Sequence, residues 1–249
     1  MNAWPGQLPE LVMSETEGGQ QSHYIVTGGS SGIGLALTRR LIGRGHRVST
    51  VARRAPPESN SLIRPVFCDL SELDRLESRL APLAEEAAPD GVILCHGQGD
   101  FGALEQFSAD RIRRMVDLHV TSSLLLCRLL IPIMKRSGYG TVVLLGSEAA
   151  LRGTQRGVVY CATKFALRGM AQALREECSS SGVRVGIVNP GMVDTPFFDS
   201  LDFAPGEDYE NSLDVEQVVD AVDLVLGAPG NTVIDEINLS PLKKVIRRV

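Results

Sequence analysis

Three side chains in the second half of the chain have the types and spacing needed for proton transfer. Tyr160 and Lys164 are four residues apart, so on a helix they lie one turn apart on the same face. A phenol has a pKa near ~10, and an ammonium one turn away favours the phenolate and lowers that pKa. The hydroxyl of Ser147 can hold a substrate oxygen while the phenol exchanges its proton. The same Tyr–Lys spacing also occurs by chance on solvent-exposed helix faces. Other parts of the sequence are therefore needed to decide whether this pair is catalytic.

A glycine-rich turn near the start of the chain predicts a nucleotide site. Residues 28–34 read Gly-Gly-Ser-Ser-Gly-Ile-Gly and join an apolar strand to an amphipathic segment. Such a turn directs backbone N–H groups and the positive end of a helix at a phosphate. The spacing differs from the better-known Gly-x-Gly-x-x-Gly fingerprint, and a merely flexible turn is the alternative. The residues expected to surround the phosphates are Gly28, Ser30, Ser31, Gly32, Ile33 and Gly34.

Short apolar strands alternate with amphipathic helices from residue 23 onward. Strands are predicted at 23–27, 48–52, 65–68, 92–95, 141–145, 183–188 and 233–237. Helices are predicted after the glycine turn, after a Ser71 cap, after a Ser108 cap, and at 122–134, 157–178 and 215–225. Residues 192–211 show no strong periodicity and contain three phenylalanines, which is typical of a lid or binding loop, although these rings can equally pack on the core.

This alternation predicts the α/β class, with one doubly wound parallel sheet of about seven strands and helices on both faces. Ligands bind such sheets outside the carboxyl ends of the strands. The unusual residues fall at those ends, and Tyr160 begins from the same edge. They are Gly28, Arg53, Asp69, Cys95, Ser147 and Asn189.

The charge, the cysteine content and the lengths of the apolar runs argue against several classes of function. A net charge of −5 and a pI near 5.5 leave no basic footprint for nucleic acid. Five scattered cysteines without a Cys-x-x-Cys pair favour reduced thiols in a cytoplasmic protein over disulfides or a metal site. No segment reaches ~18 uninterrupted apolar residues, so no membrane span is expected. Residues 1–22 are polar, lack the pattern of a signal peptide, and are expected to form a flexible tail before one domain at 23–249.

Taken together, the motifs resemble those of the short-chain dehydrogenase/reductase family. The resemblance covers about residues 23–240. It is carried by Thr27-Gly28-Gly29-Ser30-Ser31-Gly32-Ile33-Gly34, by Ser147, by Tyr160-x-x-x-Lys164 and by Pro190-Gly191-Met192-Val193-Asp194-Thr195. It implies a Rossmann-type sheet, a nicotinamide cofactor, and hydride transfer to or from a carbonyl or alcohol carbon.

The resemblance also implies roles for individual residues. Ser147 would bind the substrate oxygen, and Tyr160 would be the general acid in reduction and the base in oxidation. Lys164 would lower the Tyr160 pKa and bind the nicotinamide ribose. Pro190, Gly191, Val193 and Thr195 would hold the carboxamide side of the nicotinamide, with Cys95, His96 and Gly97 beside the cofactor.

The end of the second strand predicts NADP(H) rather than NAD(H). An NAD site needs an acid there for the ribose 2′-hydroxyl, whereas this chain has Arg53-Arg54. A guanidinium matches a 2′-phosphate, although the pair is also what a solvated loop would carry. Ser31 is a counter-signal, because many NADP-linked relatives carry a basic residue there. Asp69-Leu70 resembles the family's adenine-contacting position, but Asp69 can equally begin the following helix.

Two departures from the family pattern bear on catalysis. Cys95 replaces an asparagine that helps to lock the central strand, so other groups must do this; the adjacent His96 either approaches the cofactor or packs as a neutral side chain. His119 stands where the family has a fourth catalytic residue, an asparagine that holds a relay water largely through its main-chain carbonyl. A histidine can keep that carbonyl. Gly146 replaces a common serine, with little expected effect.

The sequence therefore predicts an NADP(H)-dependent oxidoreductase of a small carbonyl or alcohol substrate, without a metal, in the form of a homodimer or homotetramer. The alternative is a non-catalytic NADP(H)-binding sensor or regulatory protein on the same scaffold.

Overall fold

The computed structural model describes residues 21–85 and 88–248, so nearly all of the expected N-terminal tail lies outside the described residues. The strands are β1 His23–Thr27, β2 Arg47–Ala52, β3 Ile63–Phe67, β4 Gly91–Leu94, β5 Gly140–Leu145, β6 Val183–Pro190, β7 Phe203–Pro205, β8 Glu236–Leu239 and β9 Ile246–Arg248. The helices are α1 Gly32–Gly43, α2 Leu73–Ala84, α3 Ala109–Val116, α4 Ser122–Ser137, α5 Val158–Cys178 and α6 Val215–Leu226.

Seven parallel strands form the central sheet in the order β3-β2-β1-β4-β5-β6-β8. The order reverses direction between β1 and β4, which pair with each other from Tyr24–Gly91 to Thr27–Leu94. This is the doubly wound, Rossmann-type arrangement that the alternation of strands and helices predicted. Because all seven strands are parallel, their carboxyl ends lie along one edge.

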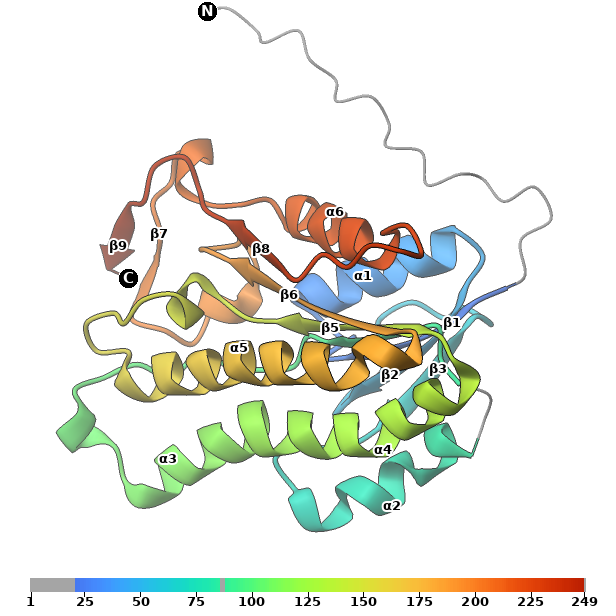
Figure 1. Ribbon diagram of the computed structural model, residues 1–249. Coiled ribbons are helices and arrows are strands. Elements are labelled where there is room, and N and C mark those ends of the chain that lie inside the picture. The colour runs from blue at the N-terminus through green and yellow to red at the C-terminus, as the bar shows by residue number, and fades with distance from the viewer. Residues whose placement is uncertain (1–20, 86–87, 249) are drawn as a thin grey trace, which may run out of the picture.

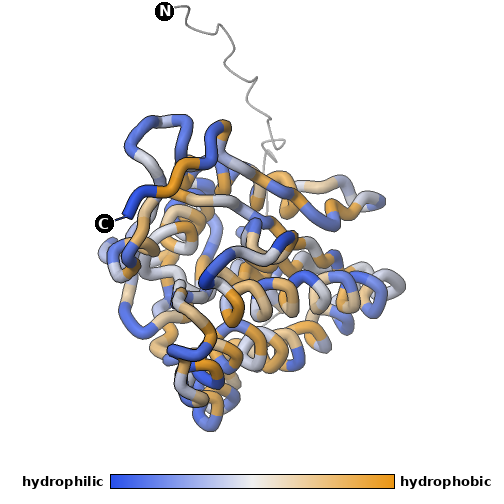
Figure 2. Tube along the Cα trace, turned by 90° about the vertical axis from the view of Figure 1, so that its left-hand side faces the viewer, coloured by the Kyte–Doolittle hydropathy of each residue, from blue (hydrophilic) through white to orange (hydrophobic). Residues whose placement is uncertain are grey.

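Helices cover both faces of the sheet and create two apolar layers (Figure 1). Helices α1 and α6 pack on one face, where Leu37, Leu41 and Val222 are buried. Helices α2, α4 and α5 pack on the other, around Leu80 and Leu130. Orange and blue segments alternate along the helices in Figure 2, as expected for helices with one apolar side. Burial on both faces explains why the strands read as continuous apolar runs.

The structure corrects several predicted details. Ser71 does not cap α2, because the N-cap is Glu72 and Ser71 is bonded to Asp69 instead. The last strand of the sheet begins at Glu236 rather than at 233. The loop after β6 contains the short strand β7, and the basic segment near residue 246 pairs with it as antiparallel strand β9. The predicted Ser108 cap is confirmed, with its hydroxyl accepting from the Arg111 N–H.

Helices α3 and α4 form one continuous helix through a π-helical turn at Asp117–Thr121. Within the described part of the chain, this is the one helix long and apolar enough to cross a membrane by length and composition. Leu126, Leu130 and Met134 of this helix are fully buried against the sheet.

The turn between α5 and β6 gives a test of the fold. Gly182 has a left-handed φ of +73°, and a Cβ there would lie 2.1 Å from the Gly138 carbonyl oxygen. We expect Gly182→Ala to lower the free energy of unfolding by at least about 1–2 kcal/mol and the melting temperature by several degrees. Gly169→Ala, at an exposed helical position with open space around it, should instead be neutral or stabilising by up to about 1 kcal/mol. Equal effects of the two substitutions in thermal unfolding would contradict this account.

Candidate active site

Two cavities meet at the carboxyl edge of the sheet, and Ser147 and Tyr160 line both. The inner cavity, of about 110 Å³, lies between the ends of β1, β4, β5 and β6. The outer cavity, of about 330 Å³, opens beside it under β7 and β9. The predicted site residues that line the inner cavity are Ile33, Cys95, His96, Gly97, Ser147, Tyr160, Lys164, Pro190, Gly191, Val193 and Thr195. Two small molecules, one in each cavity, would therefore meet at the hydroxyl groups of Ser147 and Tyr160.

The Tyr160 side chain is held by aromatic packing. Its ring centroid lies 5.0 Å from that of Phe101, 5.8 Å from that of His119 and 6.1 Å from that of Phe197. Burial raises the pKa of Tyr160 to about 12, and a hydrogen bond with the Ser147 side chain lowers it only in part. The predicted lowering of this pKa is therefore wrong for the protein without a ligand, because loss of hydration outweighs the favourable contacts.

Lys164 is buried on the same face of α5, one turn from Tyr160. Its Nζ donates to the Leu145 carbonyl at 3.0 Å and lies 5.7 Å from the centroid of the Tyr160 ring. Burial lowers the Lys164 pKa to about 8, with the Cys95 thiol opposing this in part. The ammonium has three N–H donors, and among the described residues only the Leu145 carbonyl accepts from it. Two donors are thus available to a ligand in the inner cavity, whose wall Lys164 forms.

Ser147 is the N-cap of the short helix Glu148–Ala150 at the end of β5. Its oxygen accepts from the Ala149 N–H at 3.2 Å, which orients the side chain. The hydroxyl hydrogen is consequently free to bond to Tyr160 or to a substrate oxygen.

The glycine turn fits a dinucleotide phosphate. Gly28 and Gly32 have left-handed φ angles of +68° and +51°. A Cβ at Gly34 would lie 2.5 Å from the Gly28 carbonyl oxygen, so only glycine allows the turn to close against the start of α1. Ser31 is the N-cap of α1, but its side chain makes no capping bond, which leaves the first N–H groups of the helix for an anion.

Arg53, Arg54, Asp69 and Leu70 lie farther along the same edge and do not line either cavity. The Asp69 carboxylate accepts from the N–H and hydroxyl of Ser71 at 3.0 and 2.7 Å. Burial raises the pKa of Asp69. The two hydrogen bonds from Ser71 and the nearby Arg53 charge lower it by more, so the Asp69 pKa is below its ordinary value. Asp69 therefore organises the turn before α2 but does not begin the helix, whose N-cap is Glu72, and its contact with an adenine stays a prediction. The Leu70 side chain is buried in the core.

The polar side chain of Asn189 makes Gly146 necessary. Asn189 is fully buried, and its Nδ2 donates to Glu236 and Asn238 on β8 at 2.8 and 2.9 Å. A Cβ at Gly146 would lie 1.9 Å from the Asn189 Oδ1. A side chain at position 146 would therefore require the Asn189 amide to move, and the small effect expected of glycine in place of the family's common serine stays a prediction.

His96 takes over the bracing role of the missing asparagine. Its Nδ1 lies 2.7 Å from the Thr27 hydroxyl on β1, and its Nε2 lies 2.9 Å from the Ser122 hydroxyl on α4. The Ser122 hydroxyl donates to the Leu118 carbonyl, so Nε2 must carry the ring hydrogen. Burial and the Lys164 charge lower the His96 pKa to about 3. Burial also raises the pKa of the Cys95 thiol, which keeps it protonated.

His119 is fully buried, and its ring joins the loop at Gln98 to helix α5 by hydrogen bonds. Its Nε2 accepts from the Gln98 N–H at 3.1 Å, and its Nδ1 lies 2.8 Å from the Thr163 hydroxyl. That hydroxyl donates to the Tyr160 carbonyl, so Nδ1 carries the hydrogen. The His119 carbonyl already accepts from Ser123 at 2.7 Å. These bonds give His119 a positioning role, and the water relay through its carbonyl stays a prediction.

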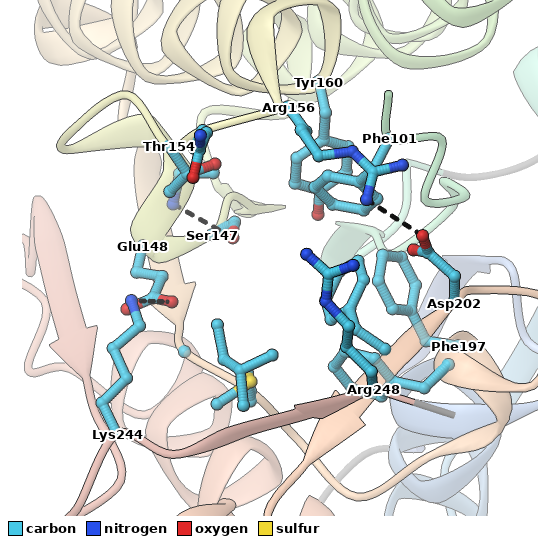
Figure 3. Close-up of a pocket in the computed structure, with 17 residues that line it drawn as sticks. Phe101, Ser147, Glu148, Thr154, Arg156, Tyr160, Phe197, Asp202, Lys244 and Arg248 are labelled. Carbon is cyan, nitrogen blue, oxygen red and sulfur yellow. Dashed lines mark hydrogen bonds and ion pairs between the residues drawn. The ribbon is translucent and has the colours of Figure 1, made fainter. Parts of the chain in front are cut away.

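The outer cavity contains residues that the sequence did not indicate. Figure 3 shows Phe101, Arg156, Asp202, Lys244 and Arg248 around the same cavity as Ser147 and Tyr160. They come from four separate segments, and none belongs to a motif. No group of three or more His, Cys, Asp or Glu side chains suited to a metal ion occurs among residues 21–85 and 88–248.

Comparison with known proteins agrees with this geometry. Residues 22–204 match the family described as short chain dehydrogenase. An uncharacterized oxidoreductase of Staphylococcus epidermidis is 27% identical over 225 residues, covering 88% of this chain and 96% of that protein. The 3-dehydrosphinganine reductase TSC10B of Arabidopsis thaliana is 32% identical over 192 residues, covering 71% of this chain and 56% of that protein.

Solved structures show the same fold. A short chain dehydrogenase/reductase family protein superposes with a TM-score of 0.79 at 25% identity, covering 88% of this chain and 96% of that one. A closed serine dehydrogenase complexed with NADP+ gives 0.76 at 24% identity, covering 87% and 93%. The chain belongs to the short-chain dehydrogenase family, whose members are oxidoreductases that use a nicotinamide cofactor.

The two buried histidines give a test of the site geometry. We expect His119 to be the Nδ1–H tautomer and His96 the Nε2–H tautomer, both uncharged from about pH 6 to 8, because burial and Lys164 lower both pKa values. Ring-nitrogen NMR correlations of 15N-labelled protein measure this, with His96→Gln and His119→Gln for assignment. Exchanged tautomers, or a titration near the ordinary histidine pKa, would contradict the networks.

Proposed function

We propose that the protein is an NADP(H)-dependent reductase that transfers hydride to the carbonyl carbon of a small organic substrate. The observation that carries the proposal is the shared wall formed by Ser147 and Tyr160. It places a proton donor where the contents of the inner and the outer cavity would meet. Family membership supports the reaction class.

The described residues supply what a carbonyl reduction needs besides hydride. The reduced nicotinamide, when bound, supplies the hydride. Ser147 and Tyr160 hydrogen-bond the substrate oxygen, and Tyr160 gives it a proton. With a pKa of about 12, the phenol is protonated at neutral pH and can act as the acid. Lys164 is mostly charged at pH 7 and loses its charge as the pH rises through about 8, so its stabilisation of the phenolate weakens in alkali.

The preference for NADP(H) is inferred from the exposed pair Arg53 and Arg54. They follow β2 at the edge of the sheet, and neither has an ion-pair partner within 21–85 and 88–248. The only acid that approaches this loop in sequence, Glu58, is bonded to Arg39. The guanidinium groups are thus available to a 2′-phosphate, although the charge of Arg53 also acts on the nearby Asp69 carboxylate.

Oligomeric state and cytoplasmic location remain predictions. Leu124 on α4 and Phe165 on α5 are 48% and 44% exposed, which supports an apolar contact with a second copy. The sensor alternative rested on Cys95 and His119. It loses support because His96 and His119 have hydrogen-bond partners at both ring nitrogens.

Removal of the Tyr160 hydroxyl oxygen tests whether this residue is the proton donor. We expect Tyr160→Phe to keep the ring packing and to lower NADPH-dependent reduction of a ketone and aldehyde panel by about 10²–10⁴-fold. The dissociation constant of NADPH, followed by fluorescence, should change by less than about twofold. Near-normal turnover in this variant would exclude Tyr160 as the acid. A wild-type protein that binds NADPH tightly but reduces nothing in the panel would favour the sensor alternative.

Removing the two guanidinium groups tests the cofactor choice. We expect the double variant Arg53→Ala/Arg54→Ala to weaken NADPH binding by about tenfold or more, because charge-assisted bonds to the 2′-phosphate are lost. NADH binding should change by less than about twofold. Arg136→Ala removes an equally exposed charge at the far end of α4 and should leave both unchanged. A parallel loss for both cofactors would contradict the assignment of a 2′-phosphate site.

A further inference from the structure

The outer cavity combines apolar walls with excess positive charge. Phe101, Phe197, Phe198, Phe203 and Met192 form its apolar lining. Three cations, Arg156, Lys244 and Arg248, line it against two carboxylates. This local excess contrasts with the net charge of −5 for the whole chain. A neutral apolar substrate would not need it.

Two of the three cations already have acidic partners in the cavity wall. Arg156 donates to Asp202 at 3.0 Å, and Lys244 donates to Glu148 at 2.5 Å. The Arg248 side chain has no ion-pair or hydrogen-bond partner within residues 21–85 and 88–248. Figure 3 shows the Arg248 guanidinium pointing into the cavity on the side of Arg156 and Asp202. One guanidinium fork is therefore available to the contents of the cavity.

The pairing of β7 with β9 determines which arginine faces the cavity. Arg248 lies opposite Phe203, and Ile246 lies opposite Pro205. Residues two apart on a strand share a face, and both Arg248 and Ile246 line the cavity. Arg247 lies between them, donates to the Pro205 carbonyl at 3.1 Å, and does not line the cavity. The chain thus places one arginine inside and its neighbour outside.

We propose that the substrate is a carbonyl compound with an apolar body and an anionic oxygen group, and that Arg248 binds this group. The inference rests on the proposed reductase function and names its substrate class. A carboxylate matches the planar fork of a guanidinium with two parallel hydrogen bonds. The phenylalanine rings would hold the apolar body while Ser147 and Tyr160 receive the carbonyl oxygen. Arg248 is then a specificity residue that takes no part in proton transfer.

A pair of nearly isosteric ketones tests the inference. We expect wild-type protein with NADPH to reduce 4-acetylbenzoate with kcat/KM about tenfold above that of the neutral 4-acetylbenzamide, mainly through KM. Arg248→Gln should bring this ratio close to one by weakening only the acid. Arg247→Gln removes the same charge one position along the strand and should leave the ratio as in wild type. A ratio near one in wild type, or a preference for the acid that survives Arg248→Gln, would overturn the inference while leaving the reductase function intact.

Calorimetry separates this inference from the proposed function. Titrating 4-acetylbenzoate into wild type, Arg248→Gln and Arg247→Gln in the presence of NADP+ measures binding without turnover. Binding of the acid that Arg248→Gln weakens about tenfold, and that the amide does not reproduce, supports the anion site even if neither ketone is reduced. Equal affinity for acid and amide, or no binding of the acid by wild type, overturns it.

Discussion

Burial of the Tyr160 hydroxyl is the constraint on which the rest of the site depends. A phenol enclosed by Phe101, Phe197 and His119 loses hydration, and the pKa rises because the phenolate loses more than the phenol. The same enclosure holds the Tyr160 ring in place, with the residue lining both cavities. The site must then offset the cost of forming the phenolate, and the Ser147 hydroxyl, which hydrogen-bonds Tyr160, does so in part.

The tautomers of the two buried histidines near Tyr160 follow from which neighbouring groups donate and which accept hydrogen bonds. A hydroxyl that donates its hydrogen to a backbone carbonyl can only accept a hydrogen bond from the imidazole beside it. This rule determines which ring nitrogen carries the hydrogen in both His96 and His119. The two histidines thereby connect β1, α4, the Gln98 loop and α5 next to the inner cavity. Replacement of two asparagines that are usual in the family therefore leaves a complete hydrogen-bond network rather than a gap.

Most of the fold and the inner half of the site could be predicted from the sequence, because both depend on periodic or adjacent residues. Strand–helix alternation implies parallel strands, and parallel strands bring Gly28, Cys95 and Ser147 to one edge. The pairing of β7 with β9 could not be predicted, since three-residue strands have no periodicity and these two are about forty residues apart. The Tyr160 pKa was wrong in direction because spacing along a helix indicates that Lys164 is near but does not measure burial.

The two halves of the site are also held by different forces. Residues at the strand ends and on α5 build the inner half, with Gly97, Gly146 and Gly191 at points of close approach. Loop side chains build the outer half, and their geometry has an energetic cost. Arg156 has a left-handed φ of +61°, which costs a non-glycine residue roughly 1–2 kcal/mol. Its carbonyl accepts from the Gly102 N–H and its guanidinium donates to Asp202, so three separate loops hold it in place. Hydrogen bonds from two other loops thus offset part of this cost and hold Arg156 in the wall of the outer cavity.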